Sequence, residues 1–219
     1  MDACGFDCLA RSYRALEFIL AGSMMQRART AHLASLAGPV GRVLMLGEGP
    51  GRLLERVLQD FPSAMVTVVD QSAAMLRQAK QRFASFPEVL DRVEWIQADL
   101  RHWVFPVHRY DLVSTPFFLD CFRQEELETL VPQITRSLKP GAYWLLADFQ
   151  IPANPAWQRW RATLLHHAMY AFFRRVTGLS ASHWVDPDIL LTRARMKRTR
   201  RQLFGAGLIR SDCWVRDGR

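Results

Sequence analysis

The stretch VLMLGEGPGRLLERV, residues 43–57, indicates the fold of this chain more clearly than any other segment. Four apolar residues run directly into three glycines at alternate positions, Gly47, Gly49 and Gly51, and then into a sequence with helical periodicity. A tight turn rarely needs more than one glycine, so this spacing predicts a backbone that comes close to something other than protein. A strand that enters such a turn and continues into a helix forms a ligand cradle at the carboxyl edge of a sheet.

Two common nucleotide-binding motifs do not match this turn. The dinucleotide fingerprint G-x-G-x-x-G requires a glycine where this chain has Arg52, or Leu54 if the count starts at Gly49. The phosphate-binding loop G-x-x-x-x-G-K-[ST] fails as well, because no Lys-Ser or Lys-Thr pair follows the glycines. The motif that remains is G-E-G-P-G.

Composition is ordinary for one globular α/β domain with some elaboration: 219 residues, 49% apolar and 23% charged. No apolar run approaches the roughly 18 residues that a membrane span needs. Asp2 and Asp7 stand where a secretory signal would carry basic residues, so the start is interpreted as a first helix. The four cysteines form no Cys-x-x-Cys pair and no cluster with metal-ligand spacing, which predicts reduced thiols, no metal site and a cytoplasmic protein.

The net charge of +8 comes mainly from one short segment. RARMKRTRR, residues 193–201, holds six basic residues and no acid. If this segment is an edge strand, Arg193, Arg195, Lys197 and Arg201 lie on one face and form a solvated charged surface. The alternative is a contact with RNA or with an anionic substrate. Because no aromatic residues interleave with the basic ones, the solvated surface is favoured.

Strands and helices alternate over the first two thirds of the chain, which favours a parallel sheet covered on both faces. The predicted strands cover residues 40–46, 64–70, 93–99, 110–116 and 142–149. The predicted helices cover residues 52–60, 73–86 and 125–138. We expect Ser72 to cap the second helix, Pro132 to kink or restart the third, and KPG at 139–141 to form a turn. Beyond the fifth strand, residues 150–186 are helical and rich in aromatic residues, and two strands around the GAG turn at 205–207 predict an antiparallel hairpin.

The G-E-G-P-G turn at 47–51 resembles the nucleotide-site loop of class I, Rossmann-like S-adenosylmethionine-dependent methyltransferases. DQSAAMLRQAKQR (70–82) resembles the D-x-S-x-x-M-L-x-x-A stretch of that family, and QADL (97–100) its third motif. YDLV (110–113) and LKPGAYWLLADF (138–149) resemble its fourth strand and the segment that leads into the fifth. The implied fold is α/β: a doubly wound, mostly parallel seven-stranded sheet with a C-terminal antiparallel hairpin, N-terminal helices and a helical insert after strand 5.

The resemblance also implies a single methyltransferase domain over residues 1–219. Its parts would be an N-terminal helical cap (1–38), a cofactor-binding core (40–149), an aromatic helical lid (150–186) and C-terminal strands (187–219).

S-adenosyl-L-methionine is the cofactor that the resemblance implies. Asp70, which ends the second strand, would accept both ribose hydroxyl hydrogens, and Asp99 would contact the adenine amino group. Many members carry an acid two residues before the first glycine, where this chain has Met45, so Glu48 or backbone carbonyls would contact the methionine ammonium. The expected cofactor-binding residues are Gly47, Glu48, Gly49, Gly51, Asp70, Gln71, Met75, Asp99, Leu100 and Thr115.

The methyl acceptor is expected beside the end of the fourth strand, where STPFFLDCF (114–122) places an apolar wall and the carboxylate of Asp120. Family members that methylate amino groups of adenine or glutamine carry Asn/Asp-Pro-Pro-aromatic here, and its absence disfavours that chemistry. Asp120 could equally be a helix-start acid, and the two adjacent histidines of the lid could be surface residues. The candidate catalytic residues are Asp120, His166, His167 and Tyr170. The candidate substrate-binding residues are Tyr13, Phe117, Phe118, Trp157 and Tyr170.

The sequence therefore predicts a cytoplasmic methyltransferase for a small, aromatic or apolar molecule, with oxygen favoured as the acceptor atom. No membrane or nucleic-acid partner is expected, and a homodimer is compatible with the sequence. Two alternatives stay open: an RNA methyltransferase that uses residues 193–201, and a cofactor-binding or regulatory protein without transferase activity.

Overall fold

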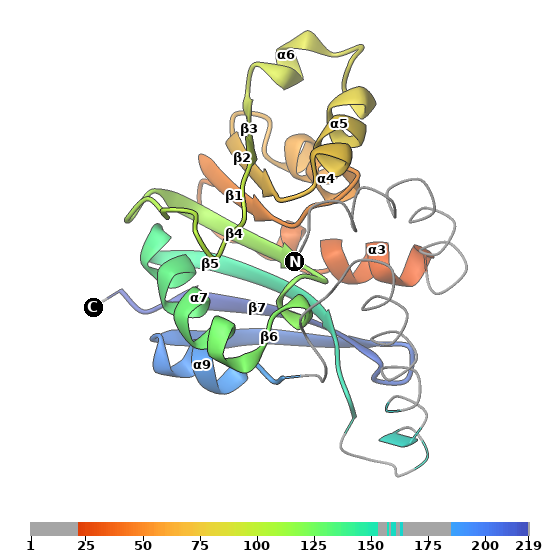
Figure 1. Cartoon of the computed structure of the whole chain (residues 1–219), viewed down its shortest axis with the longest axis vertical. Helices are drawn as coiled ribbons and strands as arrows, with labels where there is room; N and C mark the ends of the chain where they lie inside the picture. Colours follow the sequence, from red (N-terminus) through yellow and green to blue (C-terminus); the bar gives the residue numbers. More distant parts are fainter. Residues whose placement is uncertain (1–21, 153–156, 158, 161–162, 164–184, 219) are drawn as a thin grey trace.

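A seven-stranded sheet with the order β3-β2-β1-β4-β5-β7-β6 runs through the molecule (Figure 1). The structure, a computed structural model, describes residues 22–152, 157, 159, 160, 163 and 185–218. The strands are β1 (Arg42–Leu46), β2 (Met65–Asp70), β3 (Val93–Gln97), β4 (Tyr110–Pro116), β5 (Leu138–Phe149), β6 (Met196–Phe204) and β7 (Ile209–Arg216). β1 to β5 are parallel and β7 is antiparallel to both β5 and β6, so the predicted sheet and terminal hairpin are confirmed.

Helices cover both faces of this sheet. They are α3 (Gly22–Thr30), α4 (Arg52–Asp60), α5 (Ala73–Arg82), α6 (Pro87–Leu90), α7 (Gln124–Ser137) and α9 (Asp188–Arg193), with short 3-10 helices η1 (Leu33–Ser35) and η2 (Leu119–Cys121). α7 and α9 pack on one face and α4 and α5 on the other, as the two apolar clusters show. α3 packs against α4 and crosses β5, β6 and β7. Ser72 caps α5 as predicted, since its hydroxyl accepts the Met75 N–H at 3.2 Å.

The core on the α7 face is built around two buried tryptophans. Trp144 on β5 and Trp214 on β7 are cross-strand neighbours, with 0% and 2% of their surface exposed. The indole N–H of Trp144 donates to the hydroxyl of Thr115 at 2.9 Å. The indole nitrogen of Trp214, also buried, has no hydrogen-bond partner among the described residues.

The carboxyl ends of β1, β2, β4 and β5 meet at one edge of the sheet. Leu46 pairs with Val69 at the end of β1, and Pro116 pairs with Ala147 at the end of β4. Met45 of β1 also pairs with Ser114 of β4, so the loop after β1 and the loop after β4 lie side by side at this edge, where a parallel α/β sheet places its ligands.

Two local predictions between residues 125 and 142 are wrong. α7 does not restart at Pro132, because both Pro132 and Glu128, whose carbonyl loses its helical donor, are exposed and water can take that donor's place. The kink expected at Pro132 stays a prediction. The KPG segment is not a turn before the strand: β5 already begins at Leu138, which pairs with Tyr110. The register then shifts, and Gly141, at a φ of +75°, lies within this irregular part of the strand.

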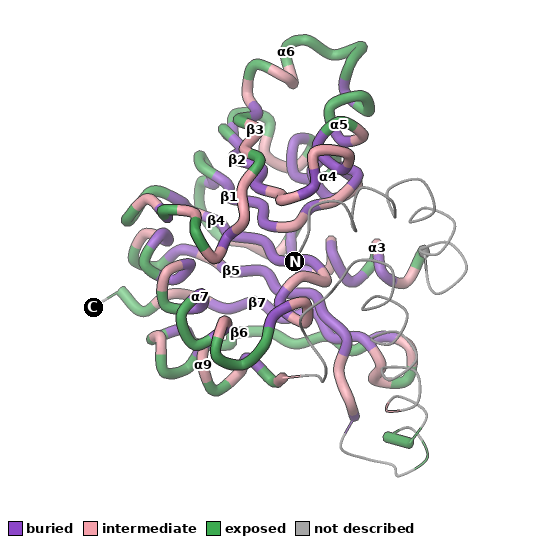
Figure 2. The backbone as a smooth tube through the Cα atoms, in the orientation of Figure 1, coloured by how far each residue is buried: buried purple, intermediate pink, exposed green. Residues whose placement is uncertain are grey.

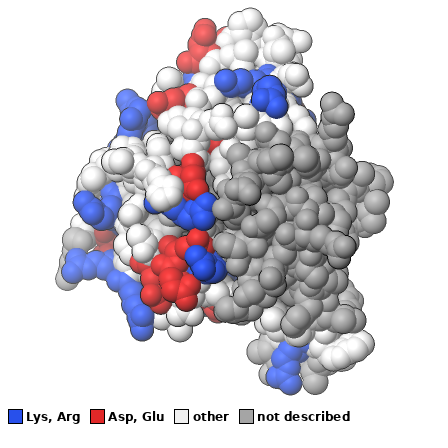
Figure 3. Space-filling model, in the orientation of Figure 1, with Lys and Arg blue, Asp and Glu red and all other residues white. Residues whose placement is uncertain are grey.

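Only residues 196–201 of the basic segment lie on β6 at the sheet edge, where residues 197–203 are exposed (Figure 2). Arg193 ends α9 and Arg195 lies before the strand at a φ of +61°, so the prediction that these two residues share one strand face with Lys197 is wrong. The register shifts between Arg198 and Arg200, which breaks the two-residue period. Arg198 and Arg201 consequently both form ion pairs with Asp188, so the prediction that Arg201 shares a face with the odd-numbered basic residues is wrong. On the face in Figure 3, basic and acidic side chains are interspersed.

Several predicted residues lie outside the described part of the chain: Tyr13, His166, His167 and Tyr170, with most of the N-terminal cap and the lid. Within the described residues, no helix combines the length and the apolar character needed to cross a membrane.

Trp144→Phe and Trp214→Phe form a matched pair of variants. Each removes one indole from the same buried cluster, but only Trp144→Phe removes a hydrogen bond and leaves the Thr115 hydroxyl without its donor. We expect Trp144→Phe to lower the free energy of unfolding by about 1–2 kcal/mol more than Trp214→Phe does. Urea denaturation measures both values, and equal losses would contradict the role given to the Trp144–Thr115 bond.

Candidate active site

The three glycines of the β1–α4 turn have different surroundings. All have a positive φ, +64° at Gly47, +68° at Gly49 and +84° at Gly51. A Cβ on Gly47 would lie 2.1 Å from the Phe118 ring, and one on Gly51 would lie 3.3 Å from Ala79. A Cβ on Gly49 would meet no atom within 4 Å. Gly47 and Gly51 are therefore required by packing, whereas Gly49 leaves its backbone open at the carboxyl edge.

Glu48 folds back from the turn and caps α4. Its Oε1 accepts the backbone N–H groups of Leu53 at 2.7 Å and Leu54 at 3.0 Å, which the first helical turn cannot satisfy itself. The side chain is 5% exposed, and its Oε2 has no hydrogen-bond partner among the described residues. Burial raises the pKa of Glu48 to about 7, against the opposing effects of the Leu54 N–H and of Arg29. The orphaned oxygen fits a ligand that carries a cation or a donor.

Asp70 ties the end of β2 to the glycine turn. Its Oδ1 accepts the Ser72 N–H at 2.9 Å, and its Oδ2 accepts the Gly49 N–H at 3.3 Å. The side chain is half-buried at the carboxyl edge. These two hydrogen bonds hold the carboxylate beside the open backbone of Gly49, at the position that the sequence assigned to a ribose-binding acid.

The Asp99 carboxylate is hydrogen-bonded to Arg101, a residue that no sequence motif marked. The guanidinium of Arg101 donates to both oxygens of Asp99, at 2.9 and 3.0 Å from Nε, and this hydrogen bonding lowers the pKa of Asp99. Arg101 also forms an ion pair with Glu126 on α7 at 3.4 Å. The predicted contact between Asp99 and adenine requires that the carboxylate is shared with Arg101 or released by it, and it stays a prediction.

The other predicted cofactor residues have mainly packing contacts in this structure. Met75 and Leu100 are each 4% exposed, and Thr115 is fully buried against Trp144. Gln71 is half-buried, and its carbonyl accepts the side-chain N–H of Gln97 at 3.4 Å. Their roles toward a cofactor stay predictions.

The phenylalanines after β4 do not form one continuous wall. The Phe118 ring lies against Gly47 and 5.0 Å from the Phe122 ring. Phe117, at a φ of +53°, turns away, and its ring lies 5.1 Å from Phe149 and 5.1 Å below the guanidinium of Arg29. The strained backbone at Phe117 thus directs two adjacent rings to opposite sides of the edge.

Asp120 lies in η2 directly after these rings and hydrogen-bonds to Asp148, the penultimate residue of β5. Burial raises the pKa of Asp120 to about 6 and that of Asp148 well above its ordinary value. The thiol of Cys121 donates to Asp120 at 3.6 Å. Asp148 was not predicted, because nothing in the sequence marks it as the partner of an acid 28 positions earlier.

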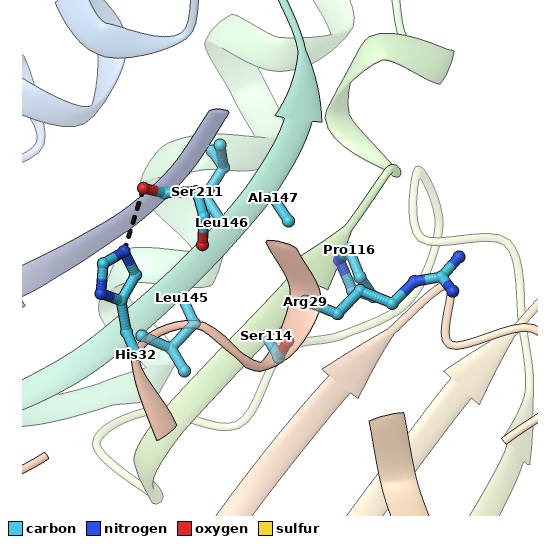
Figure 4. Close-up of a pocket in the computed structure, with 8 residues that line it drawn as sticks. All are labelled: Arg29, His32, Ser114, Pro116, Leu145, Leu146, Ala147 and Ser211. Atoms are coloured by element: carbon cyan, nitrogen blue, oxygen red, sulfur yellow. Dashed lines mark hydrogen bonds between the residues drawn. The ribbon is translucent and has the colours of Figure 1, made fainter. Parts of the chain in front are cut away.

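Two buried polar residues from the region of α3 lie near the same edge of the sheet. Arg29 is in the last turn of α3 and is 7% exposed, and His32 lies just beyond the helix end and is 6% exposed. The two residues line a small pocket against Ser114, Pro116 and the ends of β5 and β7 (Figure 4). Arg29 extends past Pro116, whereas Nε2 of His32 lies 3.0 Å from the Ser211 carbonyl. No motif in the sequence marked either residue.

Trp157, predicted to bind substrate, is 58% exposed. In the part of the chain that the structure describes, no group of three or more His, Cys, Asp or Glu side chains could hold a metal ion.

Glu48→Gln tests the ionisation of the buried cap. Glutamine keeps an oxygen that can accept from Leu53 and Leu54 but carries no charge. The raised pKa means that the folded protein holds a proton that the unfolded chain loses between pH 4.5 and about 7, so ionising Glu48 costs stability as the pH rises through this range. From about pH 5 to about pH 8, the wild type should therefore lose about 1–3 kcal/mol of unfolding free energy relative to Glu48→Gln.

Urea denaturation at both pH values measures this difference. Glu55→Gln, which changes an exposed acid on the same helix, is the matched control and should show no such trend. A difference between wild type and Glu48→Gln that is constant with pH would contradict the raised pKa.

Comparisons with known proteins agree with this geometry. Residues 43–141 match the family described as "Methyltransferase domain". Trans-aconitate 2-methyltransferase from Azoarcus sp. (strain BH72) is 35% identical over 157 residues, which cover 70% of this chain and 56% of that protein. The ubiquinone/menaquinone biosynthesis C-methyltransferase UbiE from Desulfotalea psychrophila is 28% identical over 150 residues, which cover 68% and 58%. The chain thus spans a little over half the length of these two relatives.

Among solved structures, mitomycin 7-O-methyltransferase MmcR superposes with a TM-score of 0.69 over 95% of this chain and 59% of its own, at 19% identity. That likeness shows the fold. The matched sequence, the glycine turn and the order of the strands together show the family. Residues 43–141 form a methyltransferase domain of the class I, S-adenosylmethionine-dependent family.

Proposed function

We propose that this chain transfers a methyl group from S-adenosylmethionine to a small molecule, with a hydroxyl oxygen as the favoured acceptor. The observation that carries the proposal is the β1–α4 turn, where an open backbone at Gly49, the Asp70 carboxylate and an orphaned oxygen of Glu48 converge. Such a set fits a ligand that carries vicinal hydroxyls and an ammonium group. The bound cofactor would supply an electrophilic methyl group on a cationic sulfur.

The chain's own residues would bind and orient the cofactor. Asp70 is held by two backbone N–H groups beside the open backbone of Gly49, where its carboxylate would accept ribose hydroxyl hydrogens. Glu48 would offer Oε2 to the methionine ammonium while Oε1 keeps capping α4. The Phe118 ring against Gly47 would exclude water from the cofactor side of the cleft.

Two features favour a neutral, hydroxyl-bearing acceptor. The segment from Ser114 to Phe117 lacks the amide or acid that grips an amino group. Asp120, whose burial raises its pKa to about 6, is a base matched to neutral pH. The two relatives named above do not decide the acceptor, because one is a trans-aconitate methyltransferase and the other a C-methyltransferase of quinone biosynthesis. We further propose a cytoplasmic location, in accord with the free thiols of Cys121 and Cys213.

An RNA methyltransferase is the second candidate. Arg193, Arg195 and Lys197 line a groove between α9 and the hairpin, which is the kind of surface that a nucleic-acid backbone could follow. Two observations count against it: Arg198 and Arg201 are committed to ion pairs with Asp188, and Trp214 in this groove is buried and offers no face for stacking. A non-catalytic cofactor-binding protein and a homodimer stay open predictions.

Asp70→Ala tests the cofactor site. Calorimetry should show that the wild type binds S-adenosylhomocysteine and that Asp70→Ala binds it about 100-fold more weakly, because two charge-assisted hydrogen bonds are lost. Asp60→Asn, which breaks an exposed Arg56–Asp60 pair at the end of α4, is the control and should keep wild-type affinity. An unchanged affinity in a folded Asp70→Ala protein would refute the ribose assignment.

Transfer of labelled methyl groups separates the candidate functions. The proposed activity predicts incorporation into hydroxylated aromatic acceptors but not into total RNA. Label in RNA, lost when Arg193, Arg195 and Lys197 are replaced by alanine, would establish the second candidate instead.

A further inference from the structure

Two carboxyl groups, the half-buried Asp120 and the buried Asp148, lie where β4 and β5 end. Asp148 is 2% exposed, and its side chain hydrogen-bonds to that of Asp120 in η2. The Phe149 N–H donates to Oδ1 of Asp148 at 2.9 Å, and the Cys121 thiol donates to Oδ1 of Asp120 at 3.6 Å. A backbone N–H thus holds the Asp148 carboxyl, and a thiol holds that of Asp120. Both side chains are therefore fixed by the surrounding fold, unlike two surface acids that approach each other by chance.

The charges around this pair disfavour the ionisation of both acids at once. Arg210 on β7, the cross-strand neighbour of Asp148, is the cation that faces the pair. It already forms ion pairs with Asp186 and Asp188, each at 3.0 Å. Burial and the charge of Asp120 outweigh Arg210 and raise the pKa of Asp148. Two carboxyls in contact repel each other when both are ionised, which favours a state in which they hold one proton between them.

The pair adjoins the cofactor turn. η2 follows Phe118 directly, and the Phe118 ring lies against Gly47. The negative charge of Asp70 contributes to the raised pKa of Cys121, so Asp70 is close enough to act electrostatically on the group formed by Asp120, Cys121 and Asp148. Among the described residues, the ionisable groups whose charges act on this cluster are therefore Cys121, Arg210 and Asp70.

We propose that Asp120 and Asp148 share one proton and together form the acid–base group of the acceptor site. Asp120 is the base and Asp148, in its protonated form, is a positioning residue that donates to Asp120 and holds it toward the cleft. The acceptor hydroxyl gives its proton to Asp120 while its oxygen bonds to the methyl carbon, and the electron pair of the broken carbon–sulfur bond stays on sulfur. This inference rests on the proposed function.

A consequence can be measured without knowing the acceptor. S-adenosylmethionine and S-adenosylhomocysteine share the same ammonium, carboxylate, ribose and adenine groups, but only the former carries a positive charge on sulfur. If Asp120 lies beside the reacting methyl group, that charge favours ionised Asp120. Binding of S-adenosylmethionine should then release a proton that S-adenosylhomocysteine does not release.

Calorimetry in two buffers of different ionisation enthalpy measures proton release. Near the Asp120 pKa of about 6, the wild type should release up to about half a proton more with S-adenosylmethionine than with S-adenosylhomocysteine. Asp120→Asn should abolish this difference while S-adenosylhomocysteine still binds. Asp148→Asn, which can still donate to Asp120, should keep the difference, whereas Asp148→Ala should move it to higher pH. Asp60→Asn is the control and should behave as the wild type.

Equal proton release with the two ligands in the wild type would overturn the proposal, and so would a difference that survives Asp120→Asn. If Asp120→Asn does not fold, the contrast between Asp148→Asn and Asp148→Ala decides, and identical pH dependence in these two variants overturns the positioning role. If neither ligand binds the wild type, the proposed function itself fails, which is a separate and recognisable result.

Discussion

The site depends on how one buried carboxylate holds the turn between β1 and α4. Glu48 satisfies two backbone N–H groups at the start of α4 from inside the protein, at 2.7 and 3.0 Å. Charge-assisted hydrogen bonds of this kind contribute about 1.5–3 kcal/mol each, which offsets much of the cost of burying the acid. Because Glu48 holds the start of α4 in place, the space beside Gly49 can stay unfilled by protein atoms. Asp70, at the end of β2, accepts the Gly49 N–H and so holds this part of the turn against the strand.

Two acidic groupings flank the carboxyl edge of the sheet. Glu48 and Asp70 lie on the side where we propose the cofactor, and the Asp120–Asp148 pair lies on the side where we propose the methyl acceptor. Phe118 lies between the two groupings: its ring packs on Gly47, and the next residue along the chain begins η2. Burial raises the pKa of Glu48, Asp120 and Asp148, so a nearby cation would favour the ionised form of each of these acids. A cofactor with positive charges on nitrogen and sulfur suits such an edge.

Local sequence patterns predicted the positions of the strands and helices but not which side chains would contact one another. Apolar runs predicted β1 to β5, and the GAG turn predicted the hairpin of β6 and β7. Glycine spacing with an acid at the end of β2 indicated the edge where we propose the ligand, because these signals are set by backbone geometry. Pro132 was misjudged because its cost depends on solvent reaching the Glu128 carbonyl, which is a tertiary property. The Asp120–Asp148 pair requires β4 and β5 to be neighbours, and the Arg101 grip on Asp99 depends on the loop conformation after β3.

A crystal structure with S-adenosylhomocysteine bound tests the central claim most directly. The account predicts the ligand across the β1–α4 turn, with ribose hydroxyls bonded to Asp70, the ammonium at Oε2 of Glu48 and the sulfur facing η2. A ligand bound elsewhere would contradict it. So would a nucleoside bound at this turn whose ribose hydroxyls make no hydrogen bond to Asp70.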